Sequence, residues 1–296
     1  MGKPVERVAR DIVRILGLNP GPFTLQGTNT YLFGSGPRRL LVDTGDGAQP
    51  EYLGLLRQTL GDSRIDRILI THWHDDHTGG IPKILQSDMV STNCTIYKHR
   101  HKDCPDVDGS QDISDGQSFA VDGLKLTALL TPGHTLDHVA FLVSGCGQKM
   151  LVTGDLILGQ GTTVVSDLLP YMRSLGRVLE TAPNVLLPGH GPVIQGQDAE
   201  GQDNAVRTIK EYISHRNMRE RQILQVLAGP PPAADDSLGW SVEQITSVIY
   251  QAITDPPIIM AAQKNVRLHL LKLVDEQKVK QVADPLDPQN TRWTLI

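Results

Sequence analysis

The sequence predicts an α/β protein, in which a main domain of alternating strands and helices precedes a smaller helical subdomain. Residues 5–150 alternate short apolar runs with turns and helical patterns, as is typical of a layered α/β domain. After about residue 200 these short runs give way to long helical stretches. The length of 296 residues suits one large domain with an appendage. We therefore expect a main domain at 1–200 and a helical, winged-helix-like subdomain at 201–296.

The first regular elements expected in the main domain are a strand, a helix and a second strand. The run RRLLVDTG at 38–45 predicts a buried strand that ends in a tight turn. PEYLGLLRQTLG at 50–61 predicts a helix with Gly61 near its C-terminus, and RILIT at 67–71 predicts a second strand. Further strands are expected at 124–135, 139–145, 149–155 and 184–191, with a helix at 169–181 between the last two.

The C-terminal part predicts three helices and a closing strand. A long helical stretch covers 203–229, and GPPPAADDSLG at 229–239 is typical of a linker. A second helix follows Ser241, which is a plausible N-cap, and a third covers 260–280. RWTLI at the end predicts a strand. Basic and acidic residues are equally frequent here, so no charge bias towards nucleic acid is evident.

Composition excludes several broad classes. The net charge of −5 provides no global positive field for capturing nucleic acid, although a local patch or a metal can still hold phosphate. The three cysteines are widely spaced and form no CxxC pair, which argues against disulfides and thiolate zinc sites. No apolar run approaches the ~18 residues needed to span a bilayer, so we expect no membrane partner.

The segment THWHDDHTGG at 71–80 crowds potential metal ligands into one turn. His72 and His74 are two residues apart directly after a strand, so in extended chain both side chains leave on one side. Asp76 and His77 follow as the chain turns towards a helix. One turn therefore offers two histidines to one ion and an Asp-His pair to a second.

Three more ligand-type residues stand in the same setting, each just past an apolar strand and beside a glycine. They are His134 in TPGH, Asp155 in TGD and His190 in PGH. Strand ends that share one edge of a sheet converge, so five histidines and two aspartates are expected in one pocket. Nitrogen and carboxylate ligands without thiolate suit two zinc ions, with manganese or iron as alternatives.

Together, THWHDDHTGG, TPGHT, TGD and PGHG resemble the motifs of the metallo-β-lactamase superfamily. The resemblance implies an αββα sandwich with the site on one edge. It also implies the distribution of the ligands: His72, His74 and His134 on one metal, Asp76, His77 and His190 on the other, and Asp155 between them. Asp43 in LVDTGD matches a family position too, where we expect a structural rather than a ligating residue.

Longer segments resemble one subgroup, the β-lactamase-like hydrolases of animal mitochondria, described as single-strand-specific endoribonucleases. These segments are NPGPFTLQGTNTYLFG (19–34), TPGHTLDH (131–138) and ISHRNMRERQIL (213–224). The resemblance implies single-stranded RNA as the substrate and the mitochondrial matrix as the location. The acidic residues Glu6 and Asp11 are unusual in a mitochondrial presequence, so the cytoplasm is the alternative location. Fungal thioesterases that release polyketides share the layout, as does glyoxalase II, so an acyl thioester is the alternative substrate.

A pair of metal ions can lower the pKa of a shared water towards 7 and so produce a hydroxide nucleophile. We expect Asp76 to orient that nucleophile while also binding metal. His138 is the second catalytic candidate, either as proton donor to the leaving group or, as we favour, as a residue that orients a ligand. Candidate substrate contacts are Asn29, Thr162, His215 and Arg216. A degenerate scaffold protein is disfavoured, because every ligand position is intact.

One further basic segment contains His99 and His101, which could bind metal in vitro without a function. YKHRHKD at 97–103 carries five basic or potentially basic residues and is expected to form an exposed loop.

Overall fold

The computed structural model describes residues 3–232, 239–283 and 291–296. The chain divides into two compact units. The first contains residues 1–165 and 170–210, and the second contains residues 166–169 and 211–296. The sequence-based boundary at 200/201 thus lies ten residues before the structural one, which falls inside a helix. Among the described residues, no helix has the length and apolar character that crossing a membrane requires.

The first sheet of the first unit has seven strands in sequence order. They are β1 (Val5–Ala9), β2 (Ile12–Leu16), β3 (Asn29–Phe33), β4 (Arg38–Val42), β5 (Arg64–Ile70), β6 (Val90–Lys98) and β7 (Gln111–Asp112). The pairs from β1 to β4 are antiparallel, and those from β4 to β7 are parallel. Of these seven strands, the sequence predicted β4 and β5 but not β1, β2, β3, β6 or β7.

The second sheet has five strands in the order β12-β11-β10-β9-β8. They are β8 (Ser118–Val121), β9 (Leu124–Leu130), β10 (Val139–Ser144), β11 (Met150–Gly154) and β12 (Val185–Pro188). Four of these five strands were expected from the sequence. Only β11 and β12 run parallel, and the other pairs are antiparallel.

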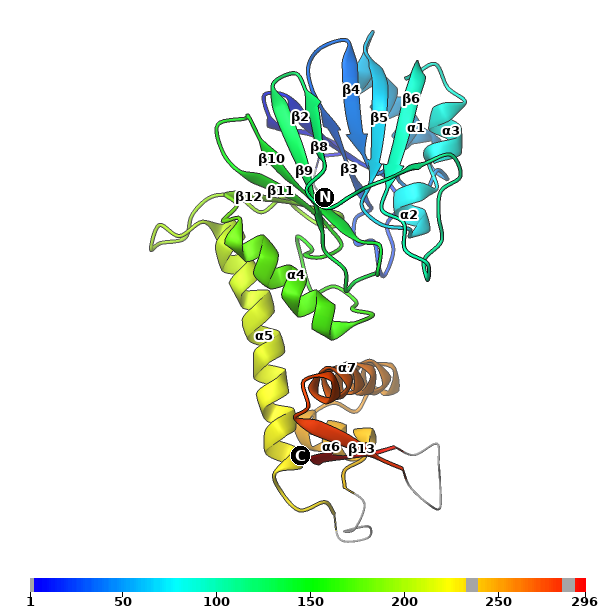
Figure 1. Ribbon diagram of the computed structural model, residues 1–296. Coiled ribbons are helices and arrows are strands. Elements are labelled where there is room, and N and C mark those ends of the chain that lie inside the picture. Colours follow the sequence, from blue (N-terminus) through cyan, green and yellow to red (C-terminus); the bar gives the residue numbers. More distant parts are fainter. Residues whose placement is uncertain (1–2, 233–238, 284–290) are drawn as a thin grey trace. The chain divides into compact units, whose positions relative to one another are not determined.

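The two sheets pack face to face, and helices cover their outer faces (Figure 1). Successive residues of a strand point to opposite faces. In β4, Leu40 and Val42 accordingly join the core between the sheets, whereas Leu41 packs with α1 (Pro50–Leu60) through Leu56. On the other sheet, α4 (Leu168–Glu180) buries an apolar face. This arrangement confirms the expected αββα sandwich.

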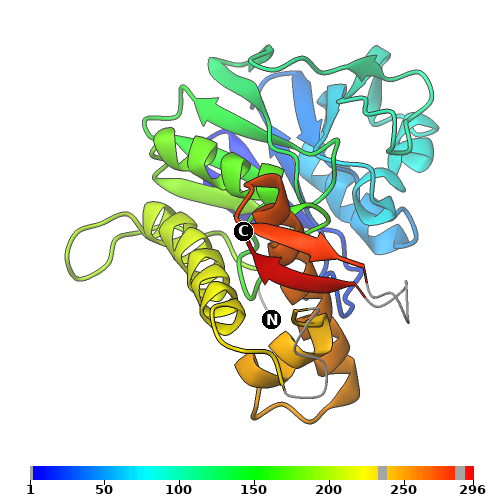
Figure 2. The ribbon, with the colours of Figure 1, turned by 60° about the horizontal axis from the view of Figure 1, so that its bottom comes forward.

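The second unit contains α6 (Val242–Ile249), α7 (Pro256–Asp275) and the hairpin of β13 (Val279–Val282) and β14 (Arg292–Leu295), which is drawn in red in Figure 2. The helix α5 (Asn204–Leu227) carries the chain from the first unit into the second. Ser241 caps α6 as expected, and Gln244 completes a capping box. Part of the predicted linker, 233–238, lies outside the described residues.

The expectation that 97–103 forms an exposed loop is wrong for its first residues. Tyr97 and Lys98 end β6, and Lys98 is buried to 1% exposure. Its Nζ lies 2.8 Å from a carboxylate oxygen of Asp137, which is itself fully buried. A lysine is rarely buried unless it is paired, and no local pattern indicates a partner 39 positions away. From His99 onwards the segment is a loop, as predicted.

Candidate metal centre

The histidine-rich turn follows β5 and is held close to its neighbours by two glycines. A Cβ at Gly80 would collide with the carbonyl oxygen of Thr44, and one at Gly79 with that of Asp46. Only glycine allows this approach, so the pair fixes where the short helix α2 (Asp75–Thr78) ends and where α3 (Ile81–Leu85) begins. The ligands of the turn are thereby placed at the end of the sheet.

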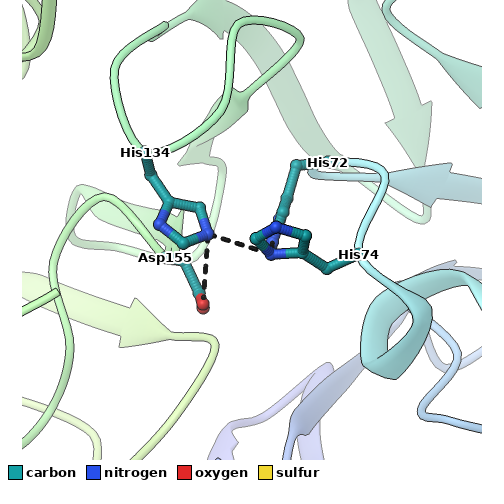
Figure 3. Close-up of side chains that lie close together, drawn as sticks. All are labelled: His72, His74, His134 and Asp155. Carbon is teal, nitrogen blue, oxygen red and sulfur yellow. Dashed lines mark hydrogen bonds and ion pairs between the residues drawn. The ribbon is translucent and has the colours of Figure 1, made fainter. Parts of the chain in front are cut away.

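The first ligand set consists of His72, His74, His134 and Asp155, whose ligand atoms all lie within 4.8 Å of one another (Figure 3). Nε2 of His72 is 2.9 Å from Nδ1 of His74, which is 3.1 Å from Nε2 of His134. Nε2 of His134 is 3.6 Å from Oδ2 of Asp155. Three nitrogens and one oxygen around one point match the four-coordinate ligand set of zinc.

The second set consists of Asp76, His77 and His190. Oδ2 of Asp76 lies 3.2 Å from Nε2 of His77 and 3.2 Å from Nε2 of His190. Asp155 connects the two sets, because its Oδ1 is 3.6 Å from His77 Nε2 and its Oδ2 is 3.3 Å from His190 Nε2. The geometry is therefore that of two adjacent sites with one carboxylate between them.

The two sheets contribute different ligands. The turn after β5 belongs to the seven-stranded sheet, whereas His134 follows β9, Asp155 follows β11 and His190 follows β12 in the five-stranded sheet. The sequence analysis expected one shared sheet edge. The convergence is instead between the ends of two sheets in the sandwich.

Buried partners orient the ligating rings. Oδ2 of Asp43 lies 2.8 Å from Nδ1 of His77, and the same carboxylate accepts hydrogen bonds from the backbone N–H and hydroxyl of Thr71 at 2.8 Å. Asp43 adopts a left-handed φ of 59°, uncommon for a residue with a side chain. With Nδ1 of His77 engaged, Nε2 is left to face a metal.

The rings of the first set have similar support. Nδ1 of His72 is 3.0 Å from Oγ1 of Thr71, and Nδ1 of His134 donates to the carbonyl oxygen of Val164 at 2.7 Å. Oγ1 of Thr163 lies 3.2 Å from the same His134 nitrogen. Each of these two rings therefore presents Nε2 to the common point.

His138 has both ring nitrogens engaged. Its Nδ1 is 2.8 Å from Oγ1 of Thr131, and its Nε2 accepts the backbone N–H of Asp155 at 3.1 Å. The ring is fully buried, and burial together with the neighbouring His134 lowers its pKa to about 3. In this arrangement the neutral ring ties the backbone of Asp155 to the loop that follows β9.

The charges of the second set are balanced by protons that a cation would replace. Burial opposes protonation of His77 and His190, but nearby carboxylates outweigh it. Asp76 raises the pKa of His77 well above its usual value, and Asp155 raises that of His190 to about 9. Despite burial, the histidines hold the pKa of both carboxyls below the usual range. Metal binding at such a site releases protons.

Two buried polar atoms without hydrogen-bond partners also indicate that these residues can hold a metal. Nε2 of His77 and Oδ1 of Asp155 are buried without a hydrogen-bond partner, although each lies at ion-pair distance from the other. Orphaned buried polar atoms are costly unless something binds them. Burial, with His134 as the next cause, lowers the pKa of His74 to about 4. Burial, followed by His77, holds the pKa of His72 well below its usual value. Neutral imidazoles are the form that ligates metal.

Of the remaining predicted site residues, Asn29 and Thr162 lie in the first unit, and His215 and Arg216 lie in the second. Asn29 is buried and donates to the carbonyl oxygens of Pro188 and Gly191, on either side of His190. Thr162 is exposed and precedes Thr163, which contacts His134. His215 and Arg216 lie on α5 in the second unit. Substrate contact by these residues stays a prediction.

Sequence reasoning missed Thr28, whose hydroxyl donates to Oδ2 of Asp76 at 2.8 Å. A threonine in a loop carries no pattern that points to a carboxylate 48 residues away. An antiparallel bridge between Thr28 and His190 places this loop against the second ligand set.

Residues 23–190 match the family described as Metallo-beta-lactamase superfamily. The chain belongs to the metallo-beta-lactamase superfamily. Membership implies a metal-dependent hydrolase, consistent with the two ligand sets. Residues 241–293 match the beta-lactamase associated winged helix domain, which confirms the winged-helix expectation for the C-terminal part.

Within the metallo-beta-lactamase superfamily, similar curated relatives come from animals and fungi. A Caenorhabditis elegans protein named Beta-lactamase-like protein 2 homolog is 41% identical over 94% of this chain and 89% of its own. The Drosophila melanogaster homolog of that name is 39% identical over 93% and 92%. Lactamase-like protein adaB of Aspergillus niger is 42% identical over 99% and 88%.

Solved metallo-beta-lactamase structures share the fold at low identity. A beta-lactamase domain protein from Burkholderia ambifaria superimposes with a TM-score of 0.77 at 19% identity, covering 99% of this chain and 93% of that one. A metallo-beta-lactamase family protein from Thermus thermophilus gives 0.67 at 21% identity, covering 98% and 100%. At these identities the likeness concerns the fold alone.

Proposed function

We propose that the protein is a binuclear metal-dependent endoribonuclease that hydrolyses phosphodiesters in single-stranded RNA. The observation that carries the hydrolytic part is the position of Asp155, which lies within 3.6 Å of ligand nitrogens from both sets. A carboxylate between two sites suits a pair of cations close enough to act on one phosphodiester.

Two divalent cations, zinc with manganese or iron as alternatives, would supply an activated water and polarise a phosphoryl oxygen. The chain's own residues determine where that chemistry occurs. His74 and Asp76 are the partly exposed ligands, whereas the others are buried, so substrate reaches the centre on their side. Thr28 fixes the Asp76 carboxylate by donating to Oδ2. Asp76 is therefore placed to orient a nucleophilic water.

We assign His138 a positioning role rather than proton donation. Its two nitrogens are occupied by Thr131 and the backbone of Asp155, and the ring has no exposed surface. A general acid must reach the leaving group directly or through one water. Holding the Asp155 backbone keeps the carboxylate aligned with both ligand sets.

An exposed aromatic side chain favours a nucleic acid over an acyl group. Phe23 is 77% exposed, in the same loop as Thr28. A base of single-stranded RNA stacks well on an exposed aromatic ring. The segments that resemble the single-strand-specific endoribonucleases include this loop, and the animal relatives are about 40% identical over nearly the whole chain.

The second candidate is hydrolysis of an acyl thioester at the same site. Its support is that the fungal relative, at 42% identity, is as similar to this chain as the animal ones. The resemblance to fungal polyketide-releasing thioesterases points the same way. The metal ligands do not separate the two reactions, because a polarised carbonyl and a polarised phosphoryl oxygen need the same charge.

A two-substrate assay tests the proposal. Protein of measured metal content receives either a labelled single-stranded RNA or an acyl thioester, as wild type and as Asp76→Asn. We expect wild type to cleave the RNA and the variant to lose that cleavage. Thioester hydrolysis that depends on Asp76, without RNA cleavage, would replace the proposal with the second candidate.

A further inference from the structure

A hollow of about 870 Å³ lies on the first unit beside the backbone that carries His190. Its wall is formed by the segment around β1 and β2, the start of β3 and the residues just after His190. Gly191 and Pro192 belong to this lining, and Gly191 directly follows the ligand His190. The hollow is therefore next to the second ligand set along the chain.

Asn29 physically joins the hollow to the metal centre. It lines the hollow, and its amide donates to the carbonyl oxygens of Pro188 at 2.9 Å and Gly191 at 2.8 Å. Gln160 also lines the hollow, and the preceding Gly159 donates its N–H to the carbonyl oxygen of His190 at 2.8 Å. The backbone that positions the ligand thus forms part of the wall.

The lining is basic. It contains Lys3, Arg7 and Arg14 against one acid, Glu6. Arg14 is buried and committed to the fold, because it donates to Glu6 at 3.0 Å, to Asn29 at 2.9 Å and to a backbone carbonyl. The one acidic side chain is therefore neutralised within the wall.

Lys3 and Arg7 remain as exposed cations of the hollow. In the part of the chain that the structure describes, neither forms an ion pair with a carboxylate, and Arg7 donates from Nη1 to the backbone carbonyl oxygen of Arg10. Polar amides of Gln26 and Gln160 complete this side of the lining. A concave surface with two uncompensated cations and hydrogen-bonding amides suits a phosphate group.

We propose that this hollow is a phosphate subsite, in which Lys3 and Arg7 hold a backbone phosphate of the RNA chain whose scissile bond lies at the metal centre. The assignment rests on the proposed function for the identity of the chain. The chemistry recognised is a phosphate ester, which coenzyme A also carries.

The test compares a double variant, Lys3→Gln with Arg7→Gln, against a charge-matched control, Lys83→Gln with Lys125→Gln. Both control lysines are exposed and lie outside the hollow. The substrates are a labelled single-stranded RNA and bis(p-nitrophenyl) phosphate, which has one phosphodiester and no neighbouring phosphate. All proteins are assayed at several salt concentrations with metal content measured.

For RNA we expect the double variant to raise KM about tenfold or more, with kcat unchanged. The slope of log(kcat/KM) against log[salt] should become shallower by about 0.7, the value for one lost phosphate contact on a single strand. Turnover of bis(p-nitrophenyl) phosphate and all constants of the control should stay at wild-type values. An unchanged KM for RNA, or an equal loss on both substrates, would overturn the subsite.

A second pair of substrates separates failure of the subsite from failure of the proposed function. If wild type cleaves no RNA, acetyl-coenzyme A and the phosphate-free thioester S-acetyl-N-acetylcysteamine are compared. A rise in KM for the coenzyme A ester alone would retain the phosphate subsite and reject the endoribonuclease. Equal KM values for variant and wild type on both thioesters would reject the subsite as well.

Discussion

The carboxylate of Asp43 and the imidazole of His77 form a buried pair, with Oδ2 and Nδ1 2.8 Å apart and both residues at most 2% exposed. The pair connects the end of β4 to the turn after β5. Because Asp43 does not face the ligand atoms itself, it acts on a metal only through the orientation and basicity of His77.

Replacing Asp43 with Asn should weaken the second metal site without removing a ligand. We expect metal affinity there to fall about 10- to 100-fold, as when other ligand-orienting partners are lost. The first site should keep its metal. Titration calorimetry of metal-free protein, together with metal analysis, measures both; equal affinity in the variant and wild type would contradict the orienting role.

The two ligand sets predict different metal contents for two substitutions. His77→Ala should leave about one bound ion per chain, because the first set is complete without it. Asp155→Asn should reduce occupancy of both sites, since this carboxylate lies between them. Elemental analysis after dialysis tests this stoichiometry, and loss of one ion in both variants would show that Asp155 serves a single site.

Gly189→Ala should disrupt the centre by steric conflict. A Cβ there would collide with Oδ1 of Asp155 and lie 3.0 Å from Cε1 of His77. We expect loss of metal and of hydrolysis, with the far-ultraviolet circular dichroism spectrum retained. The matched control is Gly54→Ala on α1, where no atom lies within 4 Å. That control should keep full activity and gain up to about 1 kcal/mol of stability.

His269 should make the second unit sensitive to acid. Burial, followed by the charges of Arg216, Lys272, Arg219 and His215, lowers its pKa from 6.5 to about 3. The unfolded chain therefore takes up a proton below pH 6.5 that the folded chain refuses until about pH 3. The stability from the neutral ring is complete above pH 6.5. It is lost as the pH falls, at about 1.4 kcal/mol per pH unit.

Between pH 7 and pH 5 we expect wild type to lose about 2 kcal/mol more than His269→Leu. Trp240 and Trp293 are both buried in the second unit, so their fluorescence in a Trp73→Phe background follows its unfolding in urea. Equal pH dependence in the two proteins would show that His269 titrates normally.

Phe23 should contribute to RNA binding through its aromatic face. Phe23→Ala should weaken binding of a single-stranded oligonucleotide by about 1–3 kcal/mol, the usual value of one base stacked on an aromatic ring. Phe23→Trp should retain affinity, and Phe23→Leu should not. Fluorescence anisotropy with metal-free protein measures all three. Full affinity in the leucine variant would indicate an apolar contact without stacking.

The ligand set could be read from the sequence because each ligand follows an apolar strand and stands in a short, recognisable motif. The contacts that orient the ligands could not. Asp43 with His77, Thr28 with Asp76 and Lys98 with Asp137 are pairs separated by 34 to 48 positions. Asp43 stands in a recognisable motif, but nothing local in the sequence identifies its partner, or the partners of Thr28 and Lys98. Only the folded sandwich brings them together.

The same limit explains the error about the sheets. The positions of the candidate ligands at strand ends correctly predicted that their side chains come together. Periodicity within a strand, however, does not reveal which strands share a sheet. The parallel pairing of β11 with β12 and the assignment of β5 to the other sheet depend on long-range hydrogen bonds. The candidate ligands therefore lie where an edge of one sheet meets an edge of the other, and not along a single sheet edge.

With cations bound in both ligand sets, that junction between the sheet edges would couple folding to metal supply. Each cation would connect a turn of the seven-stranded sheet to loops of the five-stranded sheet, and so act as a cross-link that closes the sandwich. A ligand that binds only the folded form stabilises it by RT ln(1 + [L]/Kd), about 4 kcal/mol at a thousand times Kd. The melting temperature of the first unit should then report the metal concentration around it, which makes thermal stability a readout of metal availability as well as of sequence.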